Sequence, residues 1–97
     1  MALVISPQIA EKLAKKHSVS QEEVAQCFAN KTGRYLRDTR AVHATNPPTM
    51  WFIAETDYGR KLKVAFVPEN GNIYLRTAFV PDATELALYK KYGNGTV

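Results

Sequence analysis

The dipeptide Asn70-Gly71 constrains the fold of this 97-residue chain more than any other feature. Asn and Gly both tolerate a positive φ, and the pair is typical of the two-residue type I′ turn between antiparallel strands. Residues rich in apolar and β-branched side chains flank it on both sides, so the segment 60–79 is predicted to be a β-hairpin.

Counting outward from this turn gives the expected register of the hairpin. Glu69 faces Asn72, and the next pairs are Val67–Tyr74, Phe66–Leu75, Ala65–Arg76, Val64–Thr77, Lys63–Ala78 and Leu62–Phe79. Because side chains alternate along a strand, this register places the large apolar groups on one face. The other face is expected to be left partly open and to present Lys61, Lys63, Tyr74 and Arg76 around Ala65 and Ala78.

Capping signals predict two helices before the hairpin and one after it. Ser6-Pro7 begins the first helix, and Ser20-Gln21-Glu22-Glu23 is a capping box for the second, which ends between Asn30 and Gly33. Asp82-Ala83-Thr84-Glu85 begins the last helix, and Gly93 ends it. Between them, Gly33 to Val42 is expected to be a polar edge strand, His43 to Pro48 a loop, and Met50 to Thr56 a strand.

This order of elements indicates an α+β fold. A helical hairpin is expected to pack on one face of a small, mostly antiparallel sheet of three or four strands, with a C-terminal helix after the sheet. The length suits one domain, which we expect over 1–93, with 94–97 as a frayed tail.

Composition narrows the classes of function. A net charge of +4 and a pI near 9.3 favour an anionic partner such as nucleic acid. The single cysteine, Cys27, excludes an internal disulfide and is expected to be a buried apolar residue. No His or Cys spacing suits a metal site, and neither a membrane span nor a signal peptide is predicted. A cytoplasmic protein without a metal, a cofactor or a membrane partner is therefore expected.

Two segments and the last helix together form a pattern known from one family. Lys16-His17-Ser18-Val19-Ser20-Gln21-Glu22-Glu23 follows the first helix, and Gly59-Arg60-Lys61-Leu62-Lys63-Val64-Ala65-Phe66 begins a hydrophobic strand. Glu85 and Tyr89 lie four residues apart in the last helix. This pattern resembles BrnT-type toxins of the RelE-like superfamily, which have a Gly at the position of Ser18, a Gly-Arg pair at the start of the strand, and a Glu and a Tyr at these offsets.

This resemblance implies a RelE-like toxin fold, RNA cleavage without a metal or cofactor, and an antitoxin protein as a partner. The chain departs from the family pattern at two places. Phe79 stands where the family has a strand-end Arg, and Thr49-Met50-Trp51 lacks the Arg usual near the start of the second strand.

Cleavage of RNA without a metal needs a base, an acid and cations that hold the phosphate. The candidate catalytic residues are Arg60 and Arg76 for the phosphate, Glu85 as a base, and Tyr89 as an acid or phosphate ligand. Lys61, Lys63, Tyr74 and Arg37 are candidates for RNA binding. Each also has a structural interpretation: a solvated basic sheet face, cross-strand packing, a helix cap for Glu85, or a charged edge for Arg37 and Arg40. His17 and His43 are interpreted as a helix-closing residue and a surface residue.

Three functions remain open at this point. The first is a toxin-like ribonuclease of a type II toxin–antitoxin system, and the second is a non-catalytic RNA- or protein-binding module that keeps the toxin fold. A homodimer and a toxin–antitoxin hetero-oligomer are both compatible with either. The third, an enzyme acting on ADP-ribosylated protein, is disfavoured because the acidic residues are scattered and form no metal-binding cluster.

Overall fold

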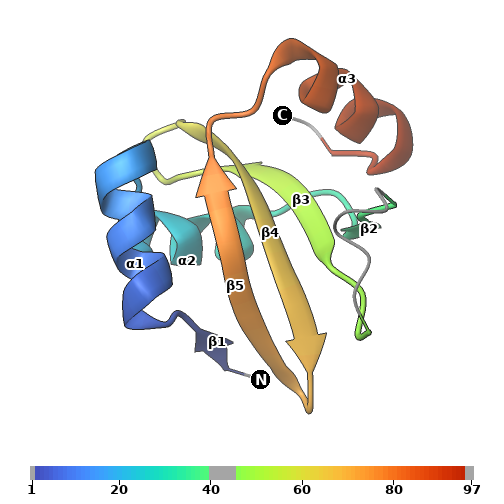
Figure 1. The fold of residues 1–97 in the computed structure, drawn as a ribbon. Helices are drawn as coiled ribbons and strands as arrows, with labels where there is room; N and C mark the ends of the chain where they lie inside the picture. Colours follow the sequence, from blue (N-terminus) through green and yellow to red (C-terminus); the bar gives the residue numbers. More distant parts are fainter. Residues whose placement is uncertain (1, 40–45, 96–97) are drawn as a thin grey trace.

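The computed structural model describes residues 2–39 and 46–95, which form an α+β fold with a five-stranded, mostly antiparallel sheet and three helices (Figure 1). The sheet has the order β1-β5-β4-β3-β2, and β1 is parallel to β5. The strands are β1 (Leu3–Val4), β2 (Leu36–Arg37), β3 (Met50–Glu55), β4 (Lys61–Glu69) and β5 (Asn72–Phe79). The helices are α1 (Pro7–Lys12), its π-helical continuation η1 (Leu13–His17), α2 (Gln21–Asn30) and α3 (Ala83–Tyr92).

The three predicted helix starts are confirmed. Ser6 accepts a hydrogen bond from the amide of Ile9, and Pro7 is the first residue of α1. Ser20 and Asp82 each form a complete capping box with the Glu three residues later. Among the described residues, no helix combines the length and the apolar character that a bilayer crossing requires.

The expected strand count was too low. β1 was missed because two residues are too short to show any alternation. The edge strand expected over Gly33 to Val42 is only Leu36–Arg37 as far as the chain is described. Arg40 and His43, and with them the end of that strand and most of the loop expected before β3, lie outside the described residues.

The hairpin turn is confirmed, but the register holds only near it. Asn70 and Gly71 have φ values of 52° and 79°, as a type I′ turn requires. The predicted pairs are present from Glu69–Asn72 to Phe66–Leu75, and then a bulge shifts β5 by one residue. The other predicted pairs are wrong: Ala65 faces Thr77, Val64 faces Ala78, and Lys63 faces Phe79. A bulge adds one residue to one strand, which the turn sequence cannot reveal.

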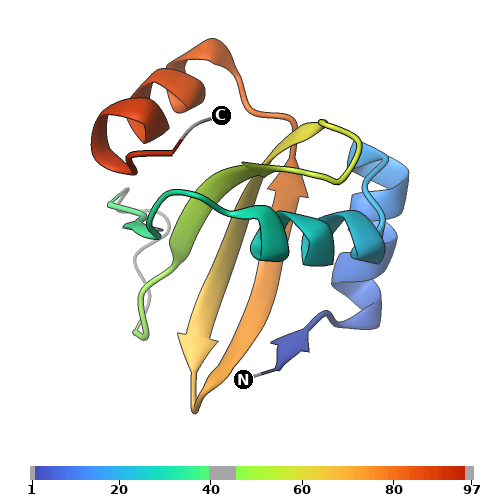
Figure 2. The same cartoon turned by 180° about the vertical axis from the view of Figure 1, so that it is seen from behind.

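One face of the sheet is covered by α1, η1 and α2. Figure 2 shows α2 crossing the sheet, with α1 beside the β5 edge. Phe28 of α2 packs edge-to-face on Phe52 and Phe66, with ring centroids 4.8 and 5.5 Å away. Cys27 is buried as expected, and burial raises the pKa of its thiol to about 12.

The opposite face was expected to be partly open, and α3 does cover part of it; Lys63, which was expected to be presented there, is buried. Trp51, Ile53 and Lys63 alternate onto it, and α3 lies against them. Tyr89 is fully buried there, 5.7 Å from the Trp51 ring, and its hydroxyl donates to the carbonyl of Arg34 at 2.8 Å. α3 therefore covers the part of this face that is formed by β3.

Candidate functional site

A tight turn between β3 and β4 fixes the position of Arg60. The Thr56 amide donates to the carbonyl of Arg60, and the Thr56 hydroxyl accepts from the Arg60 amide. Gly59 takes a φ of +83°, which the turn requires. The turn is held to α2 because Gln26 accepts from the amide of Asp57 and Asn30 donates to its carboxylate.

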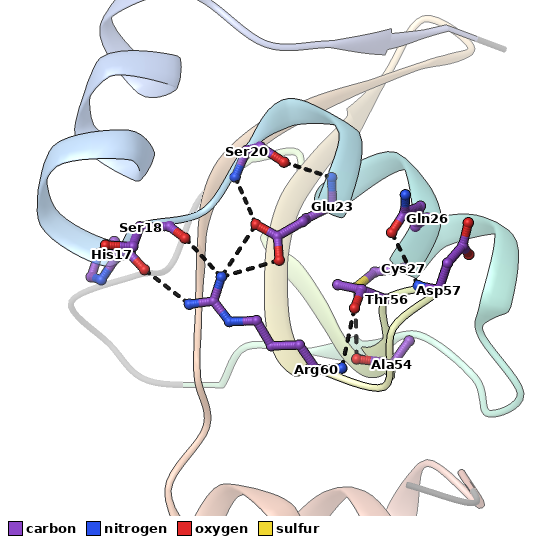
Figure 3. A network of polar contacts seen from close by, with 10 residues as sticks. All are labelled: His17, Ser18, Ser20, Glu23, Gln26, Cys27, Ala54, Thr56, Asp57 and Arg60. Carbon is purple, nitrogen blue, oxygen red and sulfur yellow. Dashed lines mark hydrogen bonds and ion pairs between the residues drawn. The ribbon is translucent and has the colours of Figure 1, made fainter.

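The side chain of Arg60 joins this turn to the end of the first helix (Figure 3). It donates to the carbonyls of His17 and Ser18 at 3.1 and 2.7 Å, and to both carboxylate oxygens of Glu23 at 3.1 and 3.2 Å. The last carbonyls of a helix have no partner within the helix, so Arg60 satisfies them. We call these residues, His17, Ser18, Glu23 and Arg60, the Arg60 network.

The Arg60 network joins the β3–β4 turn to the end of η1 and the start of α2. All of its contacts lie on the side of the sheet that carries α1 and α2, away from α3. Ser18 there adopts the left-handed conformation, with φ 52° and ψ 44°, and ends η1. The amide of Ser20 and then Arg60, working against partial burial, lower the pKa of Glu23 and keep its carboxylate charged.

A groove of about 550 Å³ lies between α3 and the β2–β3 edge of the sheet. The sheet side supplies Leu36, Trp51 and Lys63, and α3 supplies Glu85, Leu88 and Tyr92. Residues 37–39, Arg37, Asp38 and Thr39, complete the lining. We call this the α3 groove.

Leu88 and Tyr92, two exposed side chains of α3, form the outer wall of the α3 groove. Leu88 is 43% exposed and Tyr92 is 54% exposed, although large apolar side chains are usually buried. The α3 groove therefore joins an apolar and aromatic wall to charged groups. Its size falls in the range typical of sites for small ligands.

An ion pair lies on the inner side of the α3 groove. The Lys63 ammonium is 2.8 Å from the Glu85 carboxylate and 4.6 Å from the centroid of the Trp51 ring. The side chains of Lys63 and Glu85 are 10% and 20% exposed. This pair is therefore largely desolvated, while its remaining surface faces the groove.

The structure does not bring the eight predicted site residues into one place. Arg37, Lys63 and Glu85 line the α3 groove, and Tyr89 is buried beneath it. Arg60 lies in its own network, and Arg76 is an exposed residue at the β5 bulge. Lys61 and Tyr74 are half-buried on β4 and β5.

Sequence reasoning missed the groove residues Leu36, Trp51, Leu88 and Tyr92. Trp51 was expected only as a strand residue, and the two α3 residues only as apolar contacts of the helix. Their exposure is set by how α3 docks, which no local pattern shows. The described residues contain no group of His, Cys, Asp and Glu that could hold a metal ion.

The comparisons with known proteins give no further assignment. No protein-family model and no curated protein matches this chain.

Proposed function

We propose that this chain is a non-catalytic module that binds single-stranded RNA in the α3 groove. The observation that carries the proposal is that the aromatic rings of Trp51 and Tyr92 line the same groove as the exposed guanidinium of Arg37. Proteins that bind single-stranded RNA combine aromatic side chains for the bases with positive charge for the backbone.

The charge of the whole chain supports this choice over an apolar ligand, although within the groove lining Arg37 and Lys63 are matched by Asp38 and Glu85. The chain carries a net charge of +4, which favours association with a polyanion. A partner protein that inserts apolar side chains against Leu88 and Tyr92, as an antitoxin would, is the competing occupant and is separated from RNA by the experiment below.

Internal contacts of the candidate catalytic groups favour binding over cleavage. The guanidinium of Arg60 is engaged by two carbonyls and by Glu23. The Tyr89 hydroxyl is bonded to a carbonyl, and burial raises its pKa, which makes it a weaker acid. Groups that are already paired must break these contacts before they can hold a phosphate or move a proton.

A ribonuclease of the toxin type is the second candidate. The observation in its favour is the Lys63–Glu85 pair, which supplies a cation and a carboxylate beside the same groove. In that case Glu85 takes the proton of the 2′-hydroxyl as the 2′-oxygen attacks the phosphorus, and Lys63 holds the phosphate as its charge grows. The bond from phosphorus to the 5′-oxygen breaks, and the 5′-oxygen takes a proton from water.

We also propose that the fold is RelE-like and that the chain is a divergent relative of the BrnT-type toxins. The order of two helices, an antiparallel sheet and a last helix supports this. So does the left-handed conformation of Ser18, since the resembling proteins have Gly at that position and Gly adopts this conformation without strain.

The test is a titration of the full chain with a fluorescently labelled single-stranded RNA of mixed sequence. Affinity is measured by anisotropy at several salt concentrations, and the RNA is checked for cleavage afterwards. We expect binding that weakens with salt, and RNA that stays intact. Replacing Tyr92 by Ala and Arg37 by Gln should each weaken binding by about tenfold, as loss of a stacking ring or a phosphate contact does.

Lys15→Gln is the matched control, because it removes one exposed cation far along the chain from the groove. Its affinity should stay within about twofold of the unchanged chain. Cleaved RNA would establish the second candidate instead. Absence of RNA binding would overturn the proposal and leave a protein as the occupant of the groove.

A further inference from the structure

We infer that the α3 groove selects guanine, and that the Lys63–Glu85 pair reads its Watson–Crick edge. This inference rests on the proposed function, because it assigns a base to an RNA site. It starts from the hydrogen-bonding capacity that this pair retains after its internal contacts are formed.

Glu85 keeps acceptor capacity on both carboxylate oxygens. Its Oε1 accepts from the amide of Asp82 at 3.0 Å, and its Oε2 accepts from the Lys63 ammonium at 2.8 Å. A carboxylate has about four lone-pair sites, so each oxygen can accept one more donor. These two contacts also fix the orientation of the carboxylate, which lines the α3 groove.

Lys63 keeps donor capacity beside this carboxylate. An ammonium group has three N–H donors, and the contact with Glu85 occupies one. The Trp51 ring lies 4.6 Å from the nitrogen and holds the side chain against the wall of the groove. The pair thus offers a donor next to two acceptors.

Guanine is the base whose edge matches this order of groups. Its Watson–Crick edge carries the O6 acceptor, then the N1–H donor, then the N2 amino donor. Lys63 would donate to O6, while the two oxygens of Glu85 accept from N1–H and N2–H. Hypoxanthine matches the first two positions and has no amino group at the third. Uracil also matches the first two, but it places its O2 acceptor against the second carboxylate oxygen. Adenine and cytosine place an acceptor opposite the carboxylate and are repelled.

The first experiment changes the RNA and leaves the protein intact. Short oligonucleotides that differ only in the central base carry guanine, hypoxanthine, uracil, adenine or cytosine, and binding is followed by quenching of Trp51, the single tryptophan. We expect guanine to bind most tightly, hypoxanthine about tenfold more weakly, and uracil, adenine and cytosine more weakly still.

The second experiment tests the assignment to Glu85. Glu85→Gln has the same shape and keeps a residue suited to the capping box, but it loses the paired acceptors. We expect the preference for guanine to disappear. Glu22→Gln, the same change at an exposed position of α2, should retain it.

The outcomes separate the two proposals. Equal affinity for all bases would overturn the inference and leave RNA binding in place. A guanine preference that survives in folded Glu85→Gln would overturn the role of this carboxylate. No binding of any oligonucleotide would overturn the inference and the proposed function together. The series of oligonucleotides on the unchanged chain tests the guanine preference even if Glu85→Gln does not fold.

Discussion

At the scale of single residues, Arg60 has a clear structural task. Its guanidinium donates to the carbonyls of His17 and Ser18 and forms an ion pair with Glu23. A planar guanidinium with several donors can serve these groups at once, whereas the ammonium of a Lys cannot. The family resemblance pointed to Arg60 as a phosphate ligand, and that role stays a prediction.

Replacing Arg60 by Ala should lower the free energy of unfolding by about 2 kcal/mol, because partly buried carbonyls and a carboxylate lose their donor. Urea unfolding measures the change. Arg76→Ala, at an exposed position, should shift stability by less than about 0.5 kcal/mol. Equal effects of the two substitutions would contradict the structural role of Arg60.

Glu23 gives the Arg60 network a pH dependence. Its pKa in the folded chain lies below the ordinary 4.5, chiefly because the amide of Ser20 donates to the carboxylate, and also because Arg60 lies beside it. A lowered folded pKa contributes stability that is complete above 4.5 and is lost as the pH falls through the folded value.

Glu23→Gln should therefore flatten the acid side of the stability profile. The difference in free energy of unfolding between the unchanged chain and this variant should shrink as the pH falls from about 7 to about 3. Urea unfolding at each pH measures it. A difference that is constant across this range would show that ionised Glu23 contributes nothing.

At the scale of elements, α3 depends on glycines around one aromatic ring. A Cβ added at Gly93 or Gly95 would overlap the ring of Tyr89. A Cβ at Gly33 would lie 2.6 Å from the Tyr89 hydroxyl oxygen. These glycines allow the chain to close around Tyr89, and the position of α3 in turn forms the outer wall of the α3 groove.

Gly93→Ala should displace α3 and lower the free energy of unfolding by about 2 kcal/mol, a cost typical of overpacking. Because Trp51 contacts Tyr89, its fluorescence should change in the folded variant. Lys90→Ala, at an exposed position of the same helix, should alter neither quantity. Unchanged stability and fluorescence in Gly93→Ala would show that α3 is not held by this packing.

The elements also show how far the sequence could predict the fold. The capping boxes at Ser20 and Asp82 and the Asn70-Gly71 turn are local, so their predictions are confirmed. The bulge near Arg76, the parallel β1 and the covering of Lys63 by α3 depend on contacts between distant segments. The α3 groove was missed for the same reason, since its walls come from β2, β3 and α3.

At the scale of the whole molecule, the two sides of the sheet differ in how completely the helices cover them. The side that carries α1 and α2 (Figure 2) holds the packed rings of Phe28, Phe52 and Phe66, and also the Arg60 network (Figure 3). The other side is covered by α3 only in part, and the α3 groove lies at that boundary. Binding is thus proposed where the packing of the sheet is incomplete.

The central claim is that RNA occupies the α3 groove. A ¹⁵N-correlated NMR titration with single-stranded RNA tests it residue by residue. We expect the largest shifts at the Trp51 indole and at the amides of Leu88 and Tyr92, with small shifts at His17 and Glu23. Shifts concentrated around the Arg60 network, or absent at saturating RNA, would contradict the claim.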